Sequence, residues 1–183
     1  MTQTMLEAEL YEHIKRWIEG PQYAPVRDQG FRERLAMVAK TASLAWLEGA
    51  GSWMRPDLAL AVVAKRKYDS VSQLSVTAFE VKTSVSSLTE PLFQALSYSR
   101  FADYCYLAAP SDARWTHEIR QLAERFGVGL IEFDDVTVWS TYRLTFAAQM
   151  SPDPNLREMF IDAAFPEKND QARLQQMLHR QSA

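Results

Sequence analysis

The order of secondary-structure signals along residues 55–133 is the feature that most restricts the fold. RPDLALAVVAK and QLSVTAFEVKTS each predict a strand, and the polar turn RKYDSVS between them predicts an antiparallel hairpin. Helix and strand patterns then alternate through SSLTEPLFQALSYSRF, ADYCYLAAP, WTHEIRQLAERF and GVGLIEFD. Strands separated by helices predict parallel neighbours joined by right-handed crossovers. We therefore expect an α/β domain with a mixed central sheet flanked by helices.

The segments before the hairpin are less uniform. Residues 5–19 carry apolar side chains at helical spacing, and Gly20-Pro21 ends that helix. Residues 31–48 are ambiguous: Leu35, Val38 and Ala42 suit a helix, whereas SLAWLE also suits a strand. Within the helix after the hairpin, Thr89 is the expected N-cap, with Pro91 in the first turn.

The C-terminal part predicts an appendage to this domain. VTVWSTYRLTF suits an edge strand, and SPDPN at 151–155 indicates a linker. Two helical segments follow, around 156–164 and 170–180. We expect a domain over residues 1–150 and a C-terminal helical extension over 151–183.

Composition limits the class of protein. A net charge of −3 over 183 residues argues against a chain that coats nucleic acid, although it allows a local basic patch. Cys105 is the single cysteine of the sequence, which excludes an intramolecular disulfide framework. It lies in the apolar run YCYLAA, which favours a buried thiol. The acidic first 20 residues do not resemble a signal peptide, and no apolar run approaches the ~20 residues that span a bilayer. We expect a soluble cytoplasmic protein without membrane partners.

The stretch FEVKTS at 79–84 holds the first candidates for chemistry. Glu80 and Lys82 lie on the same face of the predicted strand. A solvated salt bridge at the strand end is the simplest explanation. Hairpin pairing, however, brings Asp57 to the same end, and two neighbouring carboxylates repel each other. A divalent cation between them removes that conflict, and their oxygen ligands suit Mg²⁺.

Gln94 and Tyr98 are separated by one helical turn and share a face of the helix after the hairpin. One interpretation is a buried polar pair where the helix packs on the sheet. The alternative is that both side chains form hydrogen bonds around the lysine, a metal-bound water or a phosphate.

Pro56-Asp57, followed after 22 intervening residues by Glu80-Val81-Lys82 and then by Gln94-x-x-x-Tyr98, resembles the PD-(D/E)xK nuclease superfamily. The resemblance covers roughly residues 53–133 and includes the glutamine-tyrosine motif of the RecB-type branch. It implies a restriction-endonuclease-like fold. It also implies that Asp57, Glu80 and the Val81 carbonyl bind Mg²⁺, with Mn²⁺ as a substitute. Lys82 would orient or deprotonate the attacking water, or stabilise the charge that develops on the phosphate.

Many members of this superfamily place a further acidic residue or a histidine on the first helix, and Glu9 and His13 are the candidates here. The simpler interpretation is a solvated glutamate and a half-buried histidine. For DNA contact, the candidates are Lys65-Arg66-Lys67 at the hairpin tip and Arg100. Hairpin tips also carry charge because they are solvated.

The resemblance implies a Mg²⁺-dependent nuclease that hydrolyses DNA in prokaryotic repair, restriction or phage-related metabolism, with RNA left open as a substrate. The alternative is a catalytically silent member of the fold that binds nucleic acid or protein within a larger complex. A homodimer is also open. A third hypothesis is a protein-interaction domain, since an apolar stripe in the tail could dock on a partner or pack on its own domain: Leu156, Met159, Phe160 and Ala163.

Overall fold

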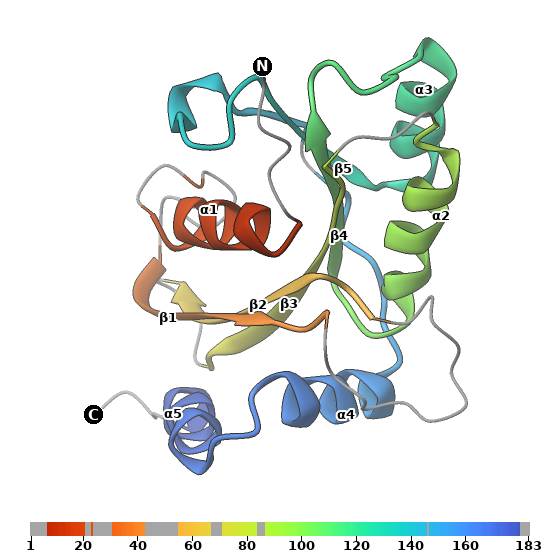
Figure 1. Ribbon diagram of the computed structural model, residues 1–183. Coiled ribbons are helices and arrows are strands. Elements are labelled where there is room, and N and C mark those ends of the chain that lie inside the picture. Colours follow the sequence, from red (N-terminus) through yellow and green to blue (C-terminus); the bar gives the residue numbers. More distant parts are fainter. Residues whose placement is uncertain are drawn as a thin grey trace.

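The computed structural model describes residues 7–20, 23, 31–42, 55–66, 71–83, 87–145 and 147–179. Within these ranges, six strands form one sheet in the order β1-β2-β3-β4-β5-β6 (Figure 1). β1, β2 and β3 are antiparallel, β3, β4 and β5 are parallel, and β6 is antiparallel to β5. The predicted mixed α/β sheet is thus confirmed. Its strands are β1 (Phe31–Lys40), β2 (Leu58–Arg66), β3 (Gln73–Val81), β4 (Tyr104–Pro110), β5 (Gly129–Phe133) and β6 (Arg143–Thr145).

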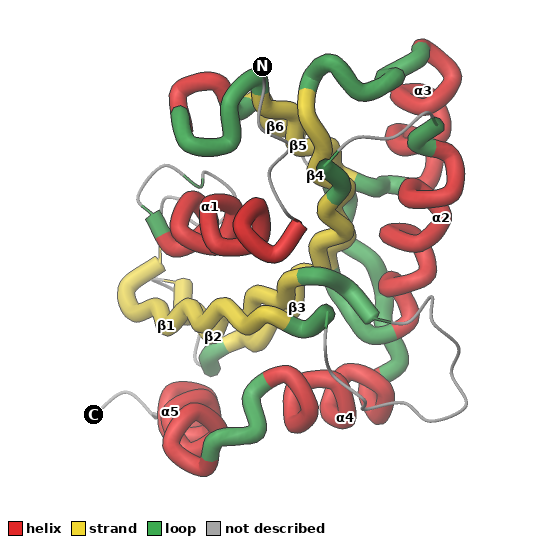
Figure 2. The backbone as a smooth tube through the Cα atoms, viewed as in Figure 1, coloured by secondary structure: helices red, strands yellow, loops and turns green. Residues whose placement is uncertain are grey.

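Helices cover both faces of the strongly twisted sheet (Figure 2). α1 lies in the concave side, whereas α2 and α3 cover β4 and β5 on the other face and α4 and α5 cover β1–β3 there. No helix of the described ranges is both long and apolar enough to cross a bilayer. The helices are α1 (Glu7–Glu19), α2 (Thr89–Ser97), α3 (His117–Phe126), α4 (Pro154–Ala164) and α5 (Lys168–His179), with short 3₁₀ helices η3 (Tyr98–Arg100) and η4 (Trp139–Thr141).

Side chains of the β2–β3 hairpin alternate between the two faces of the sheet and so belong to two hydrophobic clusters. Leu58 and Phe79 lie in the cluster that includes Ile14 of α1. Ala59 and Ala78, one position away on each strand, lie in the cluster that includes Phe160 of α4. Successive side chains point to opposite faces, so a continuously apolar strand can serve two helical layers.

One segment that the sequence left ambiguous is a strand, and one expectation about local structure was wrong. Residues 31–40 form strand β1 where helical spacing had been considered, because nine of the ten residues pair in antiparallel register with β2 and this pairing outweighs local helix preference. SLAWLE lies outside the described residues. In α2, Leu88 is the N-cap and Thr89 is already helical, without a side-chain cap. Pro91 lies in the first turn as expected.

The C-terminal extension packs on the sheet. Phe160 is fully buried, and its ring stacks on Phe101 with centroids 4.4 Å apart. Arg157 of α4 pairs with the buried Asp103 at 3.2 Å. The apolar stripe of the tail therefore packs at least partly on its own chain, although Met159 remains 51% exposed.

The thiol and the edge strand agree with expectation. Cys105 is fully buried in β4, and burial raises the pKa of its thiol to about 12. This thiol therefore belongs to the core and is a poor nucleophile. β6 is the short edge strand, paired with β5.

Candidate active site

The register of the β2–β3 hairpin brings Asp57 and Glu80 together. Leu58 pairs with Phe79, and the Asp57 amide donates a 2.9 Å hydrogen bond to the Phe79 carbonyl, which places Asp57 opposite Glu80 at the hairpin end. Both residues are buried, with 8% of Asp57 and 3% of Glu80 exposed. Two acidic side chains thus share one spot that is largely removed from water.

Two donors hold the carboxylate of Asp57. The Tyr11 hydroxyl of α1 donates to Oδ1 at 2.7 Å, and the Val81 amide of β3 donates to Oδ2 at 2.7 Å. The backbone is fixed as well, because the Thr41 amide after β1 donates to the Asp57 carbonyl at 2.9 Å. Helix α1 and the ends of β1 and β3 therefore define where this carboxylate lies.

Two other groups hold the carboxylate of Glu80. The Lys82 ammonium lies 2.5 Å from Oε1, and the Tyr98 hydroxyl donates to Oε2. The same hydroxyl lies 3.0 Å from the carbonyl oxygen of Arg55. The Lys82 side chain is 23% exposed, so its ammonium lies between the buried Glu80 and solvent.

The acidic groups of the site raise one another's pKa. Burial and the charge of Glu80 raise the pKa of Asp57 to about 7. Burial, followed by the charge of Glu80, also raises the pKa of Tyr98, so its hydroxyl stays a donor. Lys82 supplies one positive charge to a site with two carboxyl groups. A hard divalent cation would supply the further positive charge needed when both carboxyl groups are ionised.

The donor set fits Mg²⁺, which takes one or two carboxylates and keeps several waters. Asp57 and Glu80 would supply the carboxylates, and Val81, whose amide contacts Asp57, would supply a backbone carbonyl. In the described part of the chain, no group of three or more His, Cys, Asp and Glu side chains is arranged to hold a metal ion. A cation here would therefore complete its coordination with this carbonyl and with water.

No model of a known protein family matches the sequence, and the search for similar curated proteins found no match. The site is therefore interpreted from its own residues and from the motif resemblance.

Of the predicted catalytic residues, Asp57, Glu80, Lys82 and Tyr98 meet at this site. Gln94 lies one turn before Tyr98 on α2 and is half-buried. Its Oε1 is a buried acceptor that has no hydrogen-bond partner among the described residues. Its expected role around the lysine or a phosphate stays a prediction.

Of the basic residues predicted to contact DNA, Lys65 lies away from the carboxylates. Lys65 is buried in β2 at 7% exposure and is eight residues from Asp57, or about 27 Å along an extended strand. Arg66 ends the strand, and its side chain, together with Lys67, lies outside the described residues. Arg100 is exposed at the end of η3. Lys65 and the carboxylates thus lie near opposite ends of the paired strands β2 and β3.

Helix α1 reaches the site through a residue that sequence reasoning missed. Glu9 is exposed and His13 is half-buried, whereas Tyr11 contacts Asp57. A signal was present: Tyr11 shares a helix face with Ile14 and Ile18 at spacings of three and seven, and both isoleucines are buried. A tyrosine at the border of an apolar stripe brings a polar tip to the buried layer.

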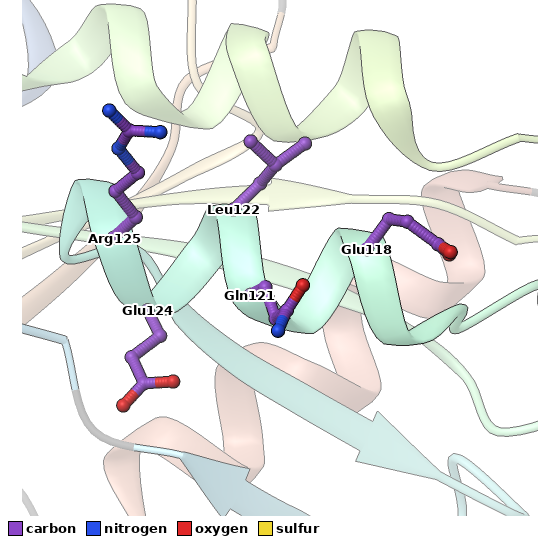
Figure 3. Close-up of a pocket in the computed structure, with 5 residues that line it drawn as sticks. All are labelled: Glu118, Gln121, Leu122, Glu124 and Arg125. Atoms are coloured by element: carbon purple, nitrogen blue, oxygen red, sulfur yellow. The ribbon is translucent and has the colours of Figure 1, made fainter.

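A surface depression lies apart from this site. Figure 3 shows it on the outer side of α3, lined by Glu118, Gln121, Leu122, Glu124 and Arg125. It shares no residue with the carboxylate cluster. Its lining lacks paired buried carboxylates, so the hairpin end remains the candidate for chemistry.

Proposed function

We propose that this protein is a metal-dependent nuclease that hydrolyses DNA phosphodiester bonds, with a PD-(D/E)xK type of active site. The observation that carries the proposal is the meeting of Asp57 and Glu80, both buried, at one end of the hairpin with Lys82 bonded to Glu80. The motif resemblance supplies the reaction class. It also suggests prokaryotic repair, restriction or phage metabolism as the setting.

Each side chain has a definite task in this proposal. Asp57, Glu80 and the Val81 carbonyl would hold Mg²⁺ or Mn²⁺, which polarises the scissile phosphate and acidifies an attacking water. Lys82 is restrained by Glu80 and partly exposed, so its ammonium can orient that water or stabilise negative charge on the phosphate. Tyr98 fixes the second oxygen of Glu80 and leaves the first to Lys82.

Cleavage assays test this proposal. Linear duplex, single-stranded and circular DNA would be incubated with the wild type in Mg²⁺, Mn²⁺ or EDTA, beside Lys82→Ala. Lys15→Ala is the matched control, because Lys15 also pairs with a glutamate, Glu19, and is similarly exposed at 29%, but lies outside the site. We expect metal-dependent cleavage by wild type and Lys15→Ala, and its loss in Lys82→Ala.

Two results would contradict the proposal. Equal cleavage by wild type and Lys82→Ala would remove the lysine from the reaction. DNA binding without cleavage under any metal condition would favour the catalytically silent member of the fold. Running RNA of the same sequence in parallel decides whether deoxyribose is required.

A further inference from the structure

Two tyrosines approach the carboxylates from opposite faces of the sheet. Tyr98 packs in the core cluster shared with α4 and donates to Glu80. Tyr11 packs against the cluster on the α1 face and donates to Asp57 at 2.7 Å. Tyr98 belongs to the motif identified in the sequence, whereas Tyr11 belongs to no motif, and its role follows from the geometry alone.

The Tyr11 hydroxyl determines the orientation of the Asp57 carboxylate. The terminal torsion angle of an aspartate side chain has a broad distribution of values. One hydrogen bond from the Val81 amide to Oδ2 therefore does not fix the position of the other oxygen. The second bond, from Tyr11 to Oδ1, fixes the plane of the group. Each oxygen can accept more than one bond, so each keeps capacity for a ligand while it accepts from its donor.

The helix that carries Tyr11 is itself held firmly. Ile14 and Trp17 of α1 are buried at 0% and 3% exposure, and Trp17 stacks on Tyr142 with ring centroids 4.7 Å apart. Glu12, next to Tyr11, pairs with Lys40 at the end of β1. The hydroxyl therefore projects from a rigid support, which is what precise positioning of a ligand requires.

We propose that Tyr11 is a positioning residue that orients Asp57 for divalent-cation binding. This inference rests on the proposed function, because it assigns Asp57 as a ligand. Hydrogen-bond partners of metal ligands fix ligand orientation, and their loss typically weakens metal affinity about 10- to 100-fold. Tyr11 acts through Asp57 and needs no contact with DNA.

The test is direct Mn²⁺ binding, measured by electron paramagnetic resonance of the free ion and by calorimetry. Tyr11→Phe deletes the hydroxyl and keeps the ring. Tyr142→Phe is the matched control, because it deletes another tyrosine hydroxyl beside α1, one that donates to the Val136 carbonyl at 2.9 Å away from the site. We expect Mn²⁺ affinity to fall about 10-fold or more in Tyr11→Phe and to stay at the wild-type value in Tyr142→Phe.

A second readout separates positioning from structural support. In cleavage assays, Tyr11→Phe should need about 10-fold more Mn²⁺ for half-maximal rate, and its rate should return to the wild-type value at saturating metal. Thermal melting shows whether both variants are folded. Equal Mn²⁺ affinity in wild type and Tyr11→Phe would overturn the role of Tyr11 and leave the proposed function standing. Absence of Mn²⁺ binding by the wild type would overturn both.

Discussion

Two acidic sites on the same sheet differ in how their charge is balanced. Glu132 of β5 receives both guanidinium nitrogens of Arg120, at 2.5 and 2.8 Å, and that guanidinium also lies over the Trp115 ring. One carboxylate meets one cation. At the hairpin end, Lys82 is the cation that acts on both Asp57 and Glu80 among the described residues. At the first site, the charge of Glu132 is balanced by the charge of Arg120. At the second site, the acidic groups outnumber the cation that contacts them.

This difference separates a structural ion pair from a candidate active site. A matched pair at a strand end gains a bidentate geometry and leaves no charge to be neutralised. Two buried carboxyl groups with one cation cost free energy unless one is protonated or a further cation binds. Under the proposed function, this excess of acidic groups is what would bind the metal.

The largest expected effect is on catalysis. Asp57→Asn and Glu80→Gln each remove a proposed metal ligand, and we expect cleavage to fall about 1000-fold, or about 4 kcal/mol of transition-state stabilisation. Glu132→Gln, which breaks the balanced pair, should leave the cleavage rate unchanged. Steady-state cleavage by the three variants checks this, and a comparable loss in Glu132→Gln would remove the distinction between the two sites.

The next effect is on pH-dependent stability without metal. Because the pKa of Asp57 is raised to about 7, the native state binds its proton more tightly than the unfolded chain does. Its stabilising contribution is complete below about pH 4 and is lost as the pH rises through about 7, by up to about 4 kcal/mol. Urea denaturation of wild type and Asp57→Asn in EDTA from about pH 4.5 to 7.5 should show this loss only in the wild type.

The same comparison yields an expectation for added metal. At neutral pH, Mg²⁺ at about 100 times its dissociation constant should stabilise the wild type by about 2.7 kcal/mol, because it binds the native state preferentially. Asp57→Asn should gain much less, whereas Glu132→Gln should gain as much as the wild type. Thermal melting over a Mg²⁺ series measures this. Equal stabilisation of all three proteins would place the cation elsewhere on the chain.

Sequence reasoning predicted which side chains meet at the hairpin end better than it predicted the elements around them. The apolar strands and their turn predicted the hairpin, whose pairing brings Asp57 to the end of the strand where a period of two places Glu80 and Lys82 on one face. Tyr98 followed from helical spacing. The segment of strand β1 stayed ambiguous because its pairing with β2 is a tertiary effect that no local pattern contains. The Tyr11 contact spans 46 residues between α1 and the start of β2, and it depends on how a helix packs on the sheet.

The smallest expected effect concerns the donors that support each site. Tyr98→Phe removes the hydroxyl that serves Glu80 and lies near the Arg55 carbonyl, so buried oxygens lose a partner and unfolding free energy should fall by about 1–3 kcal/mol. Arg120→Met removes the partner of Glu132. The side chain of Glu132 is only 10% exposed, but the arginine beside it is 44% exposed, so water can take the place of the guanidinium and the cost should be near the low end, about 1 kcal/mol. Chemical denaturation of both variants at neutral pH gives the two values. A larger loss of unfolding free energy in Arg120→Met than in Tyr98→Phe would contradict this expectation. The ion pair of Glu132 would then contribute more to stability than the hydroxyl that donates to Glu80.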